Sequence, residues 1–156
     1  MEIERKFLVK GDGWRKEAHE SWSIEQGYLA KGSATIRVRI RDRRHGTVTI
    51  KSRSRGIARH EFEYAVPLTD ARALLRLCGD ARLSKRRHRV KRGDLVWEID
   101  EFRGRHRGLV IAEVELTRRN QKIDLPDWIG KDVSTARKYQ NSYLAMGPSG
   151  AATKPS

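Results

Sequence analysis

Charged and apolar residues alternate along several short stretches of this chain, and the alternating charges come in pairs or triplets of one sign. In residues 34–41 (ATIRVRIR), arginine occupies every second position from residue 37 on, between isoleucine and valine. Glutamate follows the same rule in residues 59–66 (RHEFEYAV) and in residues 109–117 (LVIAEVELT). Because successive side chains of a β-strand point to opposite faces of the sheet, this period of two predicts strands with one charged and one apolar face.

Roughly eight segments carry this pattern or a close variant of it, while helical features are rare. The expected strands cover residues 1–9, 23–29, 34–41, 47–51, 59–66, 82–91, 95–102 and 109–117. A helical stripe of apolar residues is present in 70–78, and 127–146 is helical in part. Many antiparallel strands with few helices predict a mainly β (α+β) fold, either a barrel or a strongly curved antiparallel sheet.

The size and charge of the chain limit its organisation and its partners. With 156 residues, we expect one domain over 1–146, followed by a small, polar, disordered tail over 147–156. The formal net charge of +14 favours an anionic partner. Such a partner could be a nucleic acid, an anionic membrane surface or a small molecule of the polyphosphate type.

Cysteine usage and the lack of long apolar runs indicate the compartment. Cys78 is the only cysteine, which excludes an intrachain disulfide and a cysteine-based zinc site. A reducing, cytoplasmic location fits this composition. The chain is charged from residue 2, and no apolar run approaches membrane-spanning length, so we expect no signal peptide and no membrane association.

Two arrangements could explain strands whose charged faces carry one sign each. In the first, these faces are solvated and form scattered salt bridges, but like charges two residues apart repel, which solubility does not require. In the second, a barrel turns its charged faces into a lumen and packs its apolar faces outward against the helices near 70–78 and 127–146. Two like charges about 4 Å apart repel by roughly 4 kcal/mol at an effective dielectric constant near 20.

Such repulsion in a lumen indicates what could occupy it. A polyanion would relieve the repulsion between the basic strands, and a divalent cation would relieve the repulsion between the acidic strands. Oxygen ligands alone suit Mg²⁺ or Mn²⁺, which also bind phosphate oxygens. The second arrangement therefore predicts a metal–polyphosphate complex inside the barrel.

The first nine residues place both kinds of charge on one strand. Glu2, Glu4 and Lys6 share one face of this strand, and Phe7 and Val9 lie on the opposite face. A chain terminus is usually frayed and solvated. If the charged row serves the lumen, this terminus must instead be a strand of the barrel.

The ordered set of charged motifs resembles the triphosphate tunnel metalloenzymes of the CYTH superfamily. The segment EIERK at 2–6 matches the E-x-E-x-K signature of that family. The other matching motifs follow in the family's order as QGYL at 26–29, RVR at 37–39, TIK at 49–51, EFEY at 61–64, KRR at 85–87, Asp100 and EVE at 113–115. An isolated E-x-E-x-K triplet arises by chance in charged proteins, whereas the ordered set spans nearly the whole chain to about residue 145.

This resemblance implies an eight-stranded antiparallel tunnel with a charged lumen and helices packed outside. It also implies divalent-metal-dependent hydrolysis of triphosphate, as in the small bacterial members that act on inorganic tripolyphosphate. It assigns triphosphate binding to Lys6, Arg37, Arg39, Lys51, Lys85 and Arg87. It assigns metal binding to Glu2, Glu4, Glu113 and Glu115, with Glu61, Glu63 and Asp100 as further metal ligands or water-orienting groups. The candidate catalytic residues are Glu113, Glu115, Lys85 and Tyr28, and Tyr28 would face the substrate end.

Two positions depart from the family's pattern. His88 stands where members often have tyrosine. In the C-terminal segment, Tyr139 and Asn141 match the family, but Ala136 replaces a frequent aspartate. These departures leave the role of the last segment open without affecting the assignment of the strands.

Other functions remain open at this point. Thiamine triphosphatase, nucleoside triphosphatase and adenylyl cyclase activities occur in the same superfamily and share most site residues. A non-catalytic barrel that binds polyphosphate or RNA would use the basic runs at 37–44, 82–92 and 103–107. RNA binding usually requires exposed aromatic residues, and it leaves the paired glutamates unexplained. A third possibility is that the excess charge only aids solubility. We therefore expect a small-molecule triphosphate as the partner, and a monomer or a homodimer.

Overall fold

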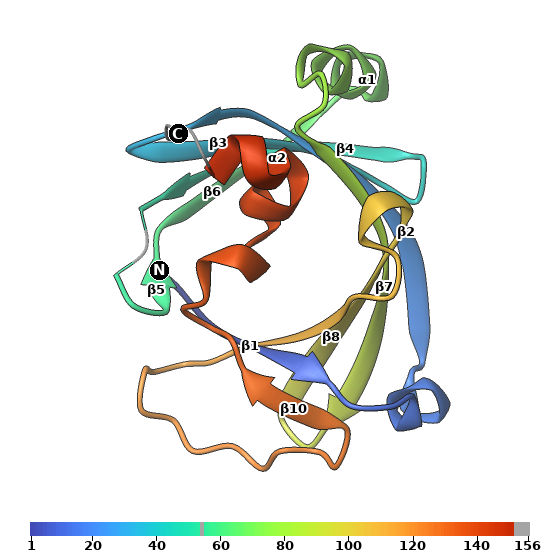
Figure 1. Ribbon diagram of the computed structural model, residues 1–156, viewed down its shortest axis with the longest axis vertical. Helices are drawn as coiled ribbons and strands as arrows, with labels where there is room; N and C mark the ends of the chain where they lie inside the picture. Colours follow the sequence, from blue (N-terminus) through green and yellow to red (C-terminus); the bar gives the residue numbers. More distant parts are fainter. Residues whose placement is uncertain (54, 152–156) are drawn as a thin grey trace.

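The protein is a strongly curved antiparallel sheet that closes almost completely into a barrel (Figure 1). The computed structural model describes residues 1–53 and 55–151. Eight longer strands form the wall: β1 (Glu2–Val9), β2 (Glu20–Lys31), β3 (Ala34–Arg41), β4 (His45–Ser52), β6 (Glu61–Val66), β7 (Arg82–Arg92), β8 (Leu95–Phe102) and β9 (Val110–Glu115). Two short strands, β5 (Ala58–Arg59) and β10 (Ile129–Asp132), pair with β1. The predicted mainly β fold is confirmed, with two short strands in addition.

Strand β1 joins the two ends of the curved sheet. The strands follow one another around the wall in the order β10-β1-β9-β8-β7-β2-β3-β4-β6. Strand β5 comes directly before β6 in the chain and pairs antiparallel with β1, with Arg59 opposite Glu2. On its other side, β1 pairs with β9 from Glu4 to Leu8. The N-terminal residues are therefore part of the wall, as their charged row required.

The main hydrophobic core lies outside the barrel. The outward-facing Phe7 and Trp97 pack together, with ring centroids 5.7 Å apart. The short 3-10 helix η1 (Gly13–Glu17) covers this region with Trp14, and Trp128 closes it from the C-terminal half of the chain. Because the large apolar side chains point outward, the lumen is left to the charged faces of the strands.

Helix α1 (Leu68–Leu77) packs against the outer face of the sheet, as expected for the 70–78 segment. Its Ala71 and Leu75 contact the outward-facing Val38 and Ile40. Gly46 permits this close approach, because a Cβ atom at this position would lie only 2.6 Å from the Cβ of Ala71. Neither helix α1 nor the second helix, within the described chain, is long and apolar enough to cross a membrane.

The C-terminal segment lies elsewhere than the sequence suggested. A helix within 127–146 was expected on the outside, but the 3-10 helix η3 (Arg137–Tyr139) and helix α2 (Asn141–Ala151) cross one end of the barrel (Figure 1). Helix α2 also continues past residue 146, the expected domain boundary, while the rest of the expected tail, 152–156, lies outside the described residues.

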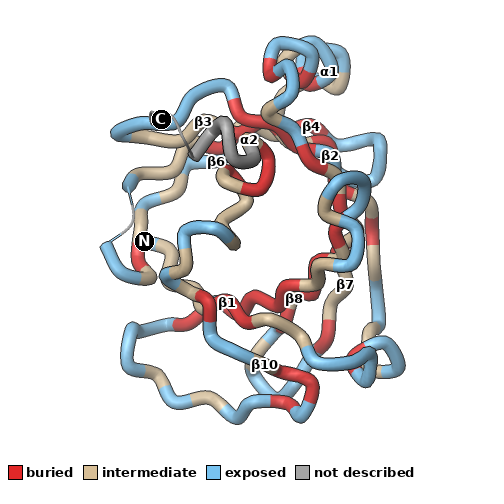
Figure 2. The backbone as a smooth tube through the Cα atoms, in the orientation of Figure 1, coloured by how far each residue is buried: buried red, intermediate tan, exposed pale blue. Residues whose placement is uncertain are grey.

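Burial of apolar side chains explains the position of helix α2. At this end of the barrel the inward-facing residues are apolar, among them Tyr28, Phe102 and Ile111. Leu144 and Ala145 of α2 are almost fully buried against them (Figure 2). Burying a leucine-sized side chain contributes about 1.5–3 kcal/mol, so the helix is more stable inside the ring than in solvent.

A basic loop fixes helix α2 in this position. Pro148 has no backbone N–H, so it cannot bond to the carbonyl of Leu144 four residues earlier. Arg105 of the 3-10 helix η2 (Gly104–His106) donates from Nη2 to the Leu144 oxygen at 3.1 Å and also to the Ala145 oxygen. The Nε2 atom of His106 lies 2.6 Å from the same Leu144 oxygen. The carbonyl left free by the proline is therefore satisfied by the barrel wall.

Candidate functional site

A cavity of about 920 Å³ occupies the lumen, and most residues of its wall are charged or polar. Every candidate residue named from the sequence lines this cavity, except Lys85 and Asp100. Those that line it are Glu2, Glu4, Lys6, Tyr28, Arg37, Arg39, Lys51, Glu61, Glu63, Arg87, Glu113 and Glu115. The charged faces of the strands therefore point into the lumen, as in the second of the two arrangements considered.

Carboxylates gather on the side of the cavity where β1, β9 and β8 are neighbours. Glu4 on β1 lies directly opposite Glu115 on β9, and Glu98 on β8 lies directly opposite Glu113 on β9. Like charges that face each other across neighbouring strands destabilise a sheet. This side of the lumen therefore carries an excess of negative charge, which a bound cation would neutralise.

Cations line much of the remaining wall. Strand β3 contributes Arg37 and Arg39, β4 contributes Lys51, and β7 contributes Arg87. Strand β2 lies between β7 and β3 and contributes Tyr28 and, at its end, Lys31 to the cavity. A polyanion that entered the lumen would thus meet cations from several strands at once.

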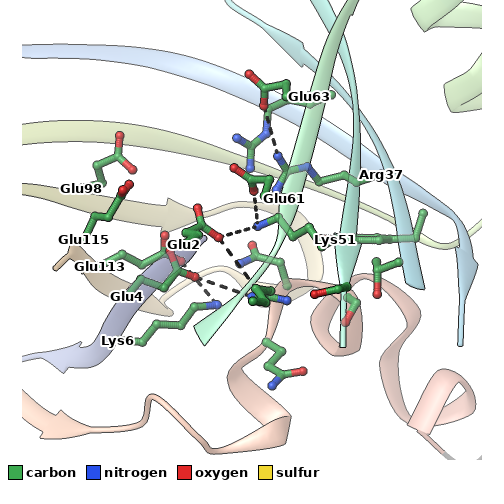
Figure 3. A pocket seen from close by; sticks show the side chains of 18 of the residues that line it. Glu2, Glu4, Lys6, Arg37, Lys51, Glu61, Glu63, Glu98, Glu113 and Glu115 are labelled. Carbon is green, nitrogen blue, oxygen red and sulfur yellow. Dashed lines mark ion pairs between the residues drawn. The ribbon is translucent and has the colours of Figure 1, made fainter. Parts of the chain in front are cut away.

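Ion pairs hold several of these cations in place before any ligand is bound (Figure 3). Lys51 Nζ lies 3.0 Å from Glu61 Oε1 and 3.8 Å from Glu2 Oε1. Arg37 Nη2 lies 3.9 Å from Glu63 Oε1. Glu61 and Glu63 therefore lie next to the cations of β3 and β4, and they are separated from the carboxylates of β8 and β9.

Lys85 and Asp100 lie beneath the cavity wall, although the resemblance assigns triphosphate binding to Lys85 and metal binding or water orientation to Asp100. The Lys85 Nζ atom is 2.7 Å from Asp100 Oδ2 and 2.9 Å from Asn141 Oδ1. Arg87 also donates to both oxygens of Asp100, at 2.8 and 2.9 Å. Burial alone would raise the pKa of Asp100, but Arg87 and Lys85 outweigh it and hold this pKa well below its usual range. In this structure Asp100 is a buried counterion that orients Arg87.

Two carboxyl groups in the lumen lose part of their acidity. Burial raises the pKa of Glu2 to about 7 despite the nearby Lys51, and the charges of Glu4 and Glu61 add to this shift. Burial also raises the pKa of Glu4, and the charge of Glu113 adds to it. These two carboxylates lack full compensation by protein cations.

In contrast, the pKa of Glu113 is lowered. Burial disfavours the charged form of Glu113, but Lys6 and Arg87 outweigh it and lower its pKa to about 2. The Lys6 Nζ atom lies 3.4 Å from Glu113 Oε2.

Cations in the lumen repel one another. Burial lowers the pKa of Arg39 to about 9, and the charges of Arg37 and Arg87 contribute to this shift. Additional negative charge beside Arg39 would therefore be stabilised.

A comparison with protein families identifies the family of this barrel. Residues 1–144 match the model of the CYTH domain. The chain belongs to the CYTH family. An inorganic triphosphatase of Acetivibrio thermocellus is 39% identical over 149 residues, covering 94% of each chain. An inorganic triphosphatase of Nitrosomonas europaea is 34% identical over 153 residues, covering 93% of this chain and 97% of the relative.

Solved structures agree with this membership. A crystal structure of an inorganic triphosphatase is 31% identical to this CYTH protein, with a TM-score of 0.68 over 94% of this chain and 95% of that one. A protein of Pyrococcus horikoshii OT3 has a TM-score of 0.61 over 77% and 80% of the chains. At 21% identity, this second likeness extends to the fold alone.

The carboxylates of this CYTH domain have the chemistry that a hard divalent cation requires. Among residues 1–53 and 55–151, no three acidic, histidine or cysteine side chains are arranged so that they could hold a metal ion as they stand. However, Glu2 Oε1 is buried without a hydrogen-bond partner, and Glu4 and Glu115 face each other directly. Because all these donors are oxygens, they fit Mg²⁺ or Mn²⁺.

The sequence reasoning missed several residues of the cavity wall. Arg59 lines the cavity, and its Nη2 atom lies 3.6 Å from Glu4 Oε1. In the period of two, Arg59 falls on the same face as Glu61. Glu98 has the same parity as Asp100 but was not assigned a role. Applying the period of two to the position two residues before Glu61 and Asp100 would have identified Arg59 and Glu98. The alternation gives no signal for the residues that the segment from η3 to α2 brings to the cavity, namely Arg137, Gln140, Asn141 and Ser142, although Asn141 matched the family pattern.

Proposed function

We propose that this CYTH domain hydrolyses inorganic triphosphate to pyrophosphate and phosphate, with Mg²⁺ or Mn²⁺ as its cofactor. The observation that carries this proposal is one cavity with a cationic side on β3, β4 and β7 and a carboxylate side on β1, β8 and β9. A metal–triphosphate complex has the complementary distribution of charge. Two near-full-length relatives named inorganic triphosphatases, at 39% and 34% identity, support the same substrate.

The cations of the lumen would bind the substrate and stabilise the transition state. The forked N–H groups of Arg37, Arg39 and Arg87 match phosphate oxygens, and Lys51 adds a further positive charge. In phosphoryl transfer, negative charge shifts toward the leaving group, here pyrophosphate. Donors that are already in place when the substrate arrives stabilise this charge without reorganisation.

The carboxylates would serve the cofactor. Glu4, Glu113 and Glu115 would hold the divalent cation, and Glu2 and Glu98 lie on the same side of the cavity. When bound, the cation supplies charge neutralisation on phosphate oxygens and acidifies a water molecule for attack. Lys6 lies beside Glu113 and would contact the phosphate chain where the two halves of the site meet.

Phosphate release from four candidate substrates tests this proposal. The purified protein should release phosphate from tripolyphosphate with Mg²⁺ or Mn²⁺, and EDTA should abolish the release. Thiamine triphosphate, ATP and pyrophosphate, assayed side by side, distinguish the other activities found in the superfamily. If none of the four is hydrolysed in a metal-dependent way, the protein is not a triphosphatase.

Replacing Arg39 by alanine should mainly weaken substrate binding. A charge-assisted hydrogen bond contributes about 1.5–3 kcal/mol, so we expect KM for tripolyphosphate to rise about 10- to 100-fold with a smaller change in kcat. Steady-state kinetics measures both constants. The same change at Arg76, which is exposed on the outer helix α1, is the matched control. Unchanged kinetics of Arg39→Ala would place Arg39 outside the substrate site.

A further inference from the structure

We propose that Gln26 is a positioning residue that orients Arg39 for the substrate while leaving the positive charge of Arg39 uncompensated. This inference rests on the proposed function, since it concerns how the same lumen binds triphosphate. Gln26 does not line the cavity and is completely buried beneath its wall. It therefore acts through Arg39 and not by contact with the substrate.

The contacts of Gln26 fix the direction of the Arg39 guanidinium. Gln26 Oε1 accepts two hydrogen bonds from Arg39, at 2.9 Å from Nε and at 2.7 Å from Nη2. Gln26 Nε2 donates to the hydroxyl of Tyr28 at 3.0 Å. Because a guanidinium has donors only, the oxygen of the amide must face Arg39. Gln26 and Tyr28 lie two residues apart on β2, and Arg39 lies directly opposite Gln26 on the neighbouring strand β3.

Arg39 differs from the other cations of the predicted phosphate site. Within the described residues, each of these other cations has a carboxylate oxygen within 4 Å: Lys6, Arg37, Lys51, Lys85 and Arg87. Arg39 has none, and the side chain that fixes it is a neutral amide. Arg39 is therefore oriented by two hydrogen bonds, but its charge is not cancelled.

The comparison with Arg87 shows why the type of partner matters. Asp100 binds Arg87 through the Nε and Nη2 atoms, the same edge that Gln26 binds on Arg39. The two arrangements hold the same edge of the guanidinium but differ by one negative charge. With Arg87, the protein orients a neutralised guanidinium, whereas with Arg39 it orients a full positive charge toward a polyanion.

Two variants of Gln26 separate orientation from charge. Gln26→Leu removes the acceptor and should weaken tripolyphosphate binding about tenfold, as expected for the loss of one or two hydrogen bonds. Gln26→Glu keeps the acceptor and adds a negative charge, so it should weaken binding by about tenfold or more while Arg39 stays in place. Binding is measured by calorimetry with tripolyphosphate in EDTA, and KM and kcat are measured with metal. We expect KM to rise and kcat to change less than about threefold in both variants.

A double-mutant cycle with Arg39→Ala shows whether Gln26 acts through Arg39. In the Arg39→Ala background, Gln26→Leu should cause no further loss of affinity beyond about twofold. An equal loss in both backgrounds would overturn the proposal, as would wild-type affinity of the Gln26→Glu variant. Gln121→Glu, the same change in the loop after β9, is the control for added charge and should leave affinity unchanged. If the protein binds tripolyphosphate but does not hydrolyse it, the proposed function fails and the binding cycle still tests Gln26. Failure of the wild-type protein to bind tripolyphosphate at all would overturn both.

Discussion

Replacing Glu113 by glutamine should lower kcat for tripolyphosphate by about 100- to 1,000-fold, the loss typical of removing one preorganised electrostatic contact. Glu113 lies at the centre of the carboxylate side, opposite Glu98 and next to Lys6 and Arg87. Its low pKa keeps it charged at neutral pH, so glutamine removes a full negative charge from the side that would hold the cation. Steady-state kinetics with Mg²⁺ or Mn²⁺ measures the loss.

Metal binding by the same variant identifies the cause of the loss. Mn²⁺ titration of the substrate-free protein, followed by electron paramagnetic resonance, should show weaker binding by Glu113→Gln. The matched control is Glu101→Gln on β8, because Glu101 points outward and pairs with Arg15 at 2.6 Å and His88 at 2.7 Å. This control should retain both turnover and Mn²⁺ affinity. Near-wild-type turnover of Glu113→Gln would show that Glu113 is not a metal ligand.

The period of two in the charged stretches was sufficient to predict the wall of the barrel. A strand has two faces only, so the side that Arg37, Arg39 or Glu113 occupies is fixed once the apolar positions are assigned. The alternation therefore grouped the charged residues on one face of each strand, whereas the choice of the lumen for these faces depended on the repulsion between like charges and on the family resemblance. The same rule would have added Arg59 and Glu98, which share the parity of residues that were identified.

Features that depend on tertiary packing could not be predicted in this way. The sequence of α2 is weakly amphipathic and contains Pro148, so nothing in it indicates that the helix enters the barrel. Its position depends on inward-facing apolar residues such as Phe102, together with the contacts of Arg105. Alternation also cannot tell how deep a side chain lies. Lys85 has the same parity as Arg87, yet Arg87 lines the cavity and Lys85 is buried beneath it.

Replacing Asp100 by asparagine should destabilise the protein by about 3 kcal/mol, because it removes the buried carboxylate that pairs with both Lys85 and Arg87, and only Arg87 keeps further carboxylates, Glu98 and Glu113, within 4 Å. Lys85 and Arg87 make three hydrogen bonds to Asp100, and the Lys85 and Asp100 side chains are almost inaccessible to solvent. Asparagine retains one acceptor oxygen and nearly the same shape, so the cost should lie at the low end of that for breaking a buried pair. For a chain of this size, the melting temperature should fall by about 6–12 °C.

Thermal and urea unfolding measure this change, and two further variants isolate its cause. Glu25→Gln makes the same chemical change in an exposed pair, 3.8 Å from Arg82, and should cost less than about 0.5 kcal/mol. Adding Lys85→Met to Asp100→Asn removes the buried cation that has lost its carboxylate partner and should recover part of the lost stability. A melting temperature of Asp100→Asn equal to that of the wild type would show that Asp100 does not stabilise these cations.

The pH dependence distinguishes charge from packing at Asp100. Its pKa is lowered by folding, so its ion pairs stabilise the protein above the pKa of the unfolded aspartate, about 3.9, and this contribution is lost as the pH falls below that value. Asparagine does not titrate, so the difference in stability between the wild type and Asp100→Asn should be largest at neutral pH and should narrow in acid. A difference that stays constant between pH 7 and pH 3 would instead indicate a packing defect. Since aspartate and asparagine have nearly the same shape, a narrowing difference indicates the loss of the Asp100 charge that pairs with Lys85 and Arg87.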